Sequence, residues 1–172
     1  MDSRPSDKTI VFTAVDGLLD SDSPDARESR ALVLQLIAAG VPVVPVTAMT
    51  LEEIQPLASE LGLRHAMVLE AGGAIARWRG DRWELEPCGL PADALLDAIR
   101  DIEDRSGASL FVDPTPREFS VPFVIESGDA NAVERAAASL GLEIRRDERF
   151  LYLVRPCDAE EAMARLREEF AA

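Results

Sequence analysis

The sequence is poor in lysine, cysteine and histidine, and each shortage excludes a class of protein. Seventeen of the 18 basic residues are arginine and only Lys8 is lysine, against 32 acidic residues, which gives a net charge of −14. A chain with this negative charge repels phosphate backbones and anionic lipids. Nucleic acids and membrane surfaces are therefore unfavourable partners. Two cysteines, Cys88 and Cys157, make neither a disulfide framework nor a zinc site. The single histidine, His65, cannot build a cluster of histidine metal ligands.

Long apolar runs are also missing. No run approaches the roughly 18 apolar residues that span a bilayer, and the polar residues 1–8 lack the apolar centre of a secretory signal. We therefore expect a cytoplasmic protein. With 172 residues, of which 47% are hydrophobic, the chain can bury one sizeable core or two small lobes.

Apolar segments alternate with amphipathic ones over the first 75 residues. The patterns predict strands over Thr9–Val15, Val41–Val46 and Ala66–Leu69, and helices over Asp25–Ala39 and Leu51–Leu61. This order implies a three-stranded parallel sheet with right-handed crossovers. In such sheets ligands bind at the carboxyl ends of the strands. Here those ends are Asp16, Thr47 and Glu70.

The period of the pattern changes after residue 75. A hairpin over Ala74–Trp78 and Arg82–Glu86 and a helix over Pro91–Asp104 come first. The remaining segments read as strand, strand, helix, strand, strand and helix: Leu110–Asp113, Phe119–Glu126, Asn131–Leu140, Leu142–Arg146, Phe150–Arg155 and Asp158–Phe170. We therefore predict an α/β protein with a parallel core over residues 1–75 and an α+β lobe over 76–157. The last helix, residues 158–172, is expected to return to the core.

Several short segments, in chain order, resemble motifs of the haloacid dehalogenase superfamily. They are Ile10–Leu19, Val43–Thr50, Leu69–Ile75, Arg117–Phe123, and Arg149–Phe150 with Cys157–Asp158. The pattern is that of the Cof-type, C2-capped branch, and Arg117–Phe123 is similar to the cap motif of mannosyl-3-phosphoglycerate phosphatases. The resemblance implies a truncated Rossmannoid core of three parallel strands with an α+β cap of the C2 type.

The resemblance also implies a chemistry. Members of the superfamily hydrolyse phosphomonoesters through an aspartyl-phosphate, with a second Asp as acid and base, a Thr or Ser on the phosphoryl group, a Lys beside it, and Mg²⁺. In this chain Ala14 stands at the nucleophile position, Asp16 at the acid/base position, and Thr47 with Gly17 at the phosphate-binding positions. The stretch that matches the lysine motif, residues 158–161, contains no lysine. We therefore expect a vestigial acid/base residue and neither a metal nor another cofactor.

The matching cap and linker residues are candidates for substrate recognition: Arg117, Ser120, Glu70, Gly72 and Gly73. Structural roles stand beside these functional ones. Asp16 can be a turn residue, Thr47 a helix cap and Glu70 a contact at the linker. Arg117 can equally be an ion-paired surface residue.

The sequence ends at Ala172, shortly after the last predicted helix. We therefore expect the family's fourth core strand and acidic metal loop to be absent, which would leave Thr9–Val15 as a bare sheet edge. Proteins normally cover such an apolar edge. The candidates are a second copy, giving a homodimer, a complementing chain, or the chain's own termini.

These observations favour a pseudophosphatase: a binding or regulatory module that does not catalyse, with a sugar phosphate as the candidate ligand. One alternative is a sugar-phosphate phosphohydrolase with altered chemistry, in which Asp16 acts as general base. Another is half of a split enzyme that a partner completes. A purely structural role is the last.

Overall fold

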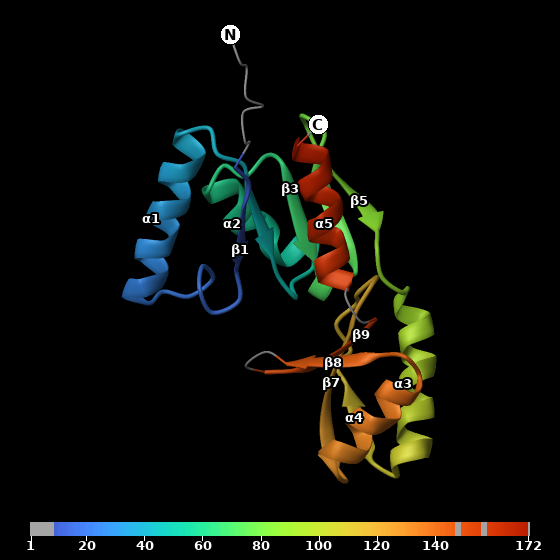
Figure 1. The fold of residues 1–172 in the computed structure, drawn as a ribbon. Helices are drawn as coiled ribbons and strands as arrows, with labels where there is room; N and C mark the ends of the chain where they lie inside the picture. The colour runs from blue at the N-terminus through green and yellow to red at the C-terminus, as the bar shows by residue number, and fades with distance from the viewer. Residues whose placement is uncertain (1–8, 147–148, 156–157, 172) are drawn as a thin grey trace.

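Two β-sheets, connected through residues 88–91, form the framework of the chain in a computed structural model (Figure 1). The structure describes residues 9–146, 149–155 and 158–171, so Lys8 and Cys157 lie outside it. The first sheet has the order β1-β2-β3-β4-β5 and the second the order β6-β7-β9-β8.

The strands and helices follow one another in the order that the sequence predicts. The strands of the first sheet are β1 (Val11–Ala14), β2 (Val43–Val46), β3 (Ala66–Leu69), β4 (Ala74–Trp78) and β5 (Trp83–Pro87). Those of the second are β6 (Ser109–Val112), β7 (Val121–Ser127), β8 (Glu143–Arg146) and β9 (Leu151–Val154). The helices are α1 (Pro24–Ala38), α2 (Leu51–Glu60), the 3₁₀ turn η1 (Glu70–Gly72), α3 (Ala92–Ser106), α4 (Ala130–Ser139) and α5 (Asp158–Ala171).

The parallel part of the first sheet confirms the predicted α/β architecture. β1 pairs with β2 and β2 with β3, both in parallel. The helix between β2 and β3 begins as expected, because the Thr50 hydroxyl accepts from the Glu53 amide and the Glu53 carboxylate accepts from the Thr50 amide. Both crossovers therefore bring the carboxyl ends of β1 and β2 to one edge of the sheet.

The hairpin of β4 and β5 corrects the predicted boundary at residue 75. β4 pairs antiparallel with β3, and β5 with β4, so the hairpin extends the first sheet instead of belonging to the second lobe. The first three residues of β4, Ala74–Ala76, are buried, as in an inner strand with neighbours on both sides. The connection between the lobes therefore lies after β5, at residues 88–91.

Helices cover both faces of the first sheet (Figure 1). One face packs against α1 and α2, with Val33 and Ile54 in that core. The other face packs against α5, whose Ala162 and Leu166 are fully buried beside Val44. The last helix, α5, thus covers the sheet that contains the first strand, β1. No helix within the described residues has the length and apolar character of a membrane span.

The second lobe is a four-stranded antiparallel sheet with helices on one face. α3 contributes Ile99 and Ile102 to a core that contains Phe123 of β7 and Leu153 of β9. Because side chains alternate along a strand, the neighbours of Phe123 and Leu153 belong to the opposite face. Pro122, Tyr152 and Arg145 lie side by side on that face, as the pairing of β7, β9 and β8 shows.

The backbone at Gly73 approaches the second lobe too closely for any side chain. A Cβ atom added there would lie 2.5 Å from the Cβ and 2.6 Å from the carbonyl oxygen of Phe119. We expect Gly73→Ala to lower the free energy of unfolding by about 1–3 kcal/mol in urea titrations, through overpacking. Gly62→Ala, where nothing lies within 4 Å, is the control and should cost about 1 kcal/mol, from its left-handed backbone alone. Equal losses in the two variants would contradict the steric argument.

β1 is an edge strand in the part of the sheet that the structure describes. The amide of Val11 donates to the carbonyl of Pro42, just before β2, and that of Val15 to the carbonyl of Val46. Because amides alternate along a strand, those of Phe12 and Ala14 point to the open side. Each unpaired amide offers about 1 kcal/mol on pairing, and we predict that a second copy pairs there. Light scattering should give the mass of a dimer, and Ala14→Pro, which removes one open amide, should shift it toward the monomer. A monomeric parent at all concentrations would refute the prediction.

Candidate functional site

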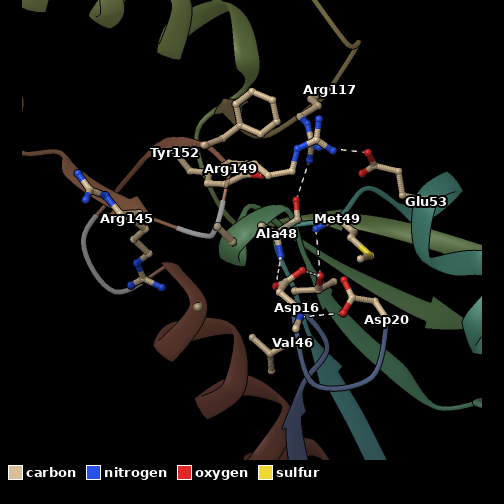
Figure 2. Close-up of a pocket in the computed structure, with 16 residues that line it drawn as sticks. Asp16, Asp20, Val46, Ala48, Met49, Glu53, Arg117, Arg145, Arg149 and Tyr152 are labelled. Carbon is tan, nitrogen blue, oxygen red and sulfur yellow. Dashed lines mark hydrogen bonds and ion pairs between the residues drawn. The ribbon is translucent and has the colours of Figure 1, made fainter. Parts of the chain in front are cut away.

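A cleft of about 530 Å³ lies between the carboxyl ends of β1 and β2 and the open face of the second sheet (Figure 2). Its lining comes from both lobes: Asp16, Gly17, Asp20, Val46, Thr47, Ala48, Met49, Glu53, Ala71, Arg117, Arg145, Arg146, Arg149, Phe150, Tyr152 and Ala159. This is the place where parallel α/β sheets bind ligands. Asp16 and Thr47, predicted to meet at this edge, do so.

The Asp16 carboxylate is held by groups that follow β2. The Thr47 hydroxyl donates to Asp16 Oδ1 at 2.7 Å, and the Ala48 amide donates to Asp16 Oδ2 at 3.0 Å. The Thr47 oxygen in turn accepts from the Met49 amide at 3.1 Å. Thr47 is 2% exposed, so its hydroxyl is positioned by the fold. Both oxygens of the one candidate acid/base residue therefore accept hydrogen bonds from the protein itself.

A second carboxylate closes the loop after β1. Gly17 adopts a left-handed backbone, with φ of 73°, and its amide donates to Asp20 Oδ1 at 2.7 Å. Glycine suits this turn because it adopts positive φ without steric cost. Asp20 is exposed, and its side chain lines the cleft (Figure 2).

Arg117 joins the two lobes at the mouth of the cleft. Its side chain is 8% exposed. Nη1 donates to the Ala48 carbonyl at 2.7 Å, and Nη2 donates to Glu53 Oε1 at 3.2 Å (Figure 2). The guanidinium lies 5.8 Å from the centre of the Tyr152 ring, in a cation–π contact. Its Nε is buried and has no hydrogen-bond partner.

Three further arginines line the cleft, two from β8 and one that precedes β9: Arg145, Arg146 and Arg149. An acidic residue faces this group from the segment after β6. Hydrogen bonds from Thr115, and then the charges of Arg117 and Arg149, hold the pKa of Asp113 below its usual value. The second lobe thus presents a positively charged surface in a protein whose overall charge is strongly negative.

Glu70 supports the cleft from behind. The residue is 4% exposed, and its carboxylate accepts from the Phe119 amide and the Ser120 hydroxyl, both at 2.9 Å, and from the Glu118 amide at 3.4 Å. Glu70 and Ala71 both have positive φ, of 50° and 58°. The left-handed turn aims the carboxylate at the second lobe, so the structural role that the sequence left open for Glu70 is the one its contacts favour.

The structure therefore divides the predicted site residues into two groups. Asp16, Gly17, Thr47 and Arg117 line one cleft. The other candidates lie elsewhere: Glu70 and Ser120 bond each other behind the cleft, Gly72 and Gly73 are buried in the turn between β3 and β4, and Ala14 is exposed at the end of β1.

Sequence reasoning missed Asp20, Glu53, Tyr152 and the Arg145–Arg146 pair as members of the cleft. The available signal was charge: Arg145, Arg146 and Arg149 form a basic cluster in a sequence with an acidic excess. What the sequence does not reveal is which face of its sheet each of them occupies.

The Mg²⁺ ion that the resemblance implies does not fit the residues present. Ala14 offers no side-chain oxygen at the end of β1, and both oxygens of Asp16 are engaged by Thr47 and Ala48. Mg²⁺ requires oxygen ligands in near-octahedral geometry. Among the described residues, no group of three acidic, histidine or cysteine side chains could hold a metal ion.

Comparison with known proteins gives a curated relative and a set of similar structures. No protein-family model matches the sequence. The relative is the glucosyl-3-phosphoglycerate/mannosyl-3-phosphoglycerate phosphatase of Persephonella marina, 25% identical over 177 aligned positions. The match covers 84% of this chain and 66% of the relative, so the chain spans somewhat less than two thirds of that protein.

The similar structures share the fold at low sequence identity. A Thermoplasma acidophilum protein matches with a TM-score of 0.75 and 19% identity, over 94% of this chain and 72% of its own length. A haloacid dehalogenase-like hydrolase from Bacteroides thetaiotaomicron matches with a TM-score of 0.62 and 17% identity, over 93% and 76%. The comparisons bear out the resemblance at the level of the fold: the chain has the fold of haloacid dehalogenase-like hydrolases, with a cap lobe.

The contacts of Glu70 predict a large effect on stability. Glu70→Ala leaves the amides of Glu118 and Phe119 and the buried Ser120 hydroxyl without their acceptor, so we expect the free energy of unfolding to fall by about 3 kcal/mol in urea titrations. The matched control is Glu118→Ala in the same turn, an exposed side chain that should cost less than about 0.5 kcal/mol. A Glu70→Ala protein as stable as this control would show that the contact does not hold the lobes together.

Proposed function

We propose that this chain is a phosphatase-like binding module that takes a small phosphorylated, sugar-type molecule in its cleft without hydrolysing it. The single observation that carries the proposal is Ala14, at the position where the family resemblance places the nucleophile. The similarity to a sugar-phosphate phosphatase supports the ligand class. The cleft between the two lobes, with Arg117 and three further arginines in its lining, supports binding of an anion.

Ala14 closes the covalent route that the resemblance implies. A methyl group cannot attack phosphorus, and loss of a nucleophile costs on the order of 10⁶ in kcat in an enzyme that depends on one. The residue two positions later, Asp16, would have to act alone. Its carboxylate is hydrogen-bonded to Thr47 and Ala48, which holds it on the wall of the cleft.

The cleft also has little positive charge at the position where the resemblance places the phosphoryl group. The resemblance calls for a lysine near residues 158–161, where the sequence reads Asp-Ala-Glu-Glu. The described residues at the end of β1 add Asp16 and Asp20 to the cleft and no cation. A phosphoryl group that gains negative charge in a transition state would find little to stabilise it there.

Two active alternatives differ in what they require. Hydrolysis without a covalent step requires Asp16 to act as general base on water. A split enzyme requires a second polypeptide that supplies both the missing chemistry and a substitute for Ala14. Each makes a prediction that a binding module does not.

The test is a phosphatase assay on the purified full chain with Mg²⁺ and a panel of sugar phosphates, next to Asp16→Asn and Ala14→Asp. We expect no release of inorganic phosphate by the parent or Asp16→Asn, together with saturable binding of at least one sugar phosphate in calorimetry. Turnover by the parent that Asp16→Asn abolishes would overturn the proposal. Turnover that appears only in Ala14→Asp would support it, since the parent would then be inactive because it lacks the nucleophile. It would also contradict the argument that charge compensation limits hydrolysis.

A further inference from the structure

The two walls of the cleft carry opposite charges (Figure 2). The first lobe contributes the carboxylates of Asp16, Asp20 and Glu53. The second lobe contributes four arginines, which we call the arginine wall: Arg117, Arg145, Arg146 and Arg149. A ligand in this cleft therefore meets hydrogen-bond acceptors on one side and cationic donors on the other.

The donors at the strand ends are already bound to carboxylates of the chain. Asp16 takes the Thr47 hydroxyl and the Ala48 amide, and Asp20 takes the Gly17 amide. These three donors are ones that an incoming phosphoryl group would use. To reach them it would have to displace one carboxylate and lie beside the other, and repulsion between like charges opposes both steps.

The arginine wall, by contrast, has a hydrogen-bonding group that is not satisfied. Arg117 is more than nine-tenths buried, and its Nε has no partner although both terminal nitrogens are bonded. An unpaired buried donor is unfavourable, and guanidinium groups prefer planar, bidentate contacts with carboxylates and phosphates. Asp113 partly offsets the charge of this wall, but its carboxylate accepts from Thr115 at 2.8 Å.

From the opposite charges of the two walls we infer how the ligand lies: its anionic group is on the arginine wall and its hydroxyl groups are on Asp16, Asp20 and Glu53. The ligand class is a polyhydroxylated anion, such as a sugar phosphate or a sugar acid, whose hydroxyls donate to the carboxylates. This orientation is the reverse of one in which the phosphoryl group sits at the ends of β1 and β2. The inference rests on the proposed binding function and specifies how the same site uses its charges.

The test titrates the full chain with glucose 6-phosphate and follows backbone amides by NMR. We expect the largest shifts at Arg145, Arg149 and Tyr152, and at least a tenfold rise in Kd in the double variant Arg145→Gln/Arg149→Gln, which loses two charge-assisted contacts. The double variant Arg100→Gln/Arg135→Gln makes the same change in charge on exposed helical positions outside the cleft, and its Kd should change less than twofold.

A second variant tests the occupied strand ends. Asp16→Ala frees the Thr47 hydroxyl and the Ala48 amide, so inorganic phosphate should then shift the Ala48 amide and bind at least tenfold more tightly than to the parent. In the parent, inorganic phosphate should leave the Ala48 and Gly17 amides unshifted. Parent shifts centred on those two amides, with a Kd insensitive to the arginine double variant, would overturn the inference.

Failure of the inference and failure of the proposed function give different results. Binding that depends on the strand ends and not on the arginine wall refutes the orientation and leaves the binding function intact. Release of inorganic phosphate during the titration refutes the proposed function, whichever wall holds the anion. Absence of saturable binding at millimolar glucose 6-phosphate overturns the ligand class, while the lack of turnover would still stand.

Discussion

The cleft depends on one buried carboxylate. Glu70 accepts hydrogen bonds from the turn at residues 118–120, and this fixes where the second lobe meets the first. Arg117 directly precedes that turn, so its reach to the Ala48 carbonyl follows from the same joint. The contact is specific because the backbone of Gly73 lies against Phe119 with no room for a side chain. A buried charge with three donors tolerates few alternative arrangements, so the opposing walls keep a fixed separation.

Much of the fold could be predicted from local patterns in the sequence. The capping box at Thr50 and Glu53 and the apolar run before Asp16 each follow from neighbouring residues, and both occur as expected. The boundary between the lobes could not be predicted in this way, because the sequence of a hairpin does not specify which sheet its first strand joins. Only the pairing of Ala74 with Leu69 across a tight left-handed turn places β4 in the first sheet.

The same holds for the site: local motifs predict some of its residues, whereas contacts between residues far apart in the sequence determine the rest. The family motifs place Asp16 and Thr47 together, and they meet at 2.7 Å. The motifs do not show that the Asp16 carboxylate occupies the donors next to it, since that depends on side-chain orientation across 31 residues of sequence. Nor do they show that Arg145 and Tyr152 share the open face of a sheet, which depends on the register of β8 against β9.

The placement of α5 bears on how the chain is made. The first sheet begins with β1, yet one of its faces is covered by a helix more than 140 residues later, with Leu166 against Val44 and Val68. During synthesis, β1 to β5 leave the ribosome while that apolar face has no cover, and the whole second lobe must follow before α5 appears. The second lobe has its own core and can fold first. The helix encoded last thus completes the lobe encoded first, and the apolar face of the first sheet is open to aggregation until α5 has been made.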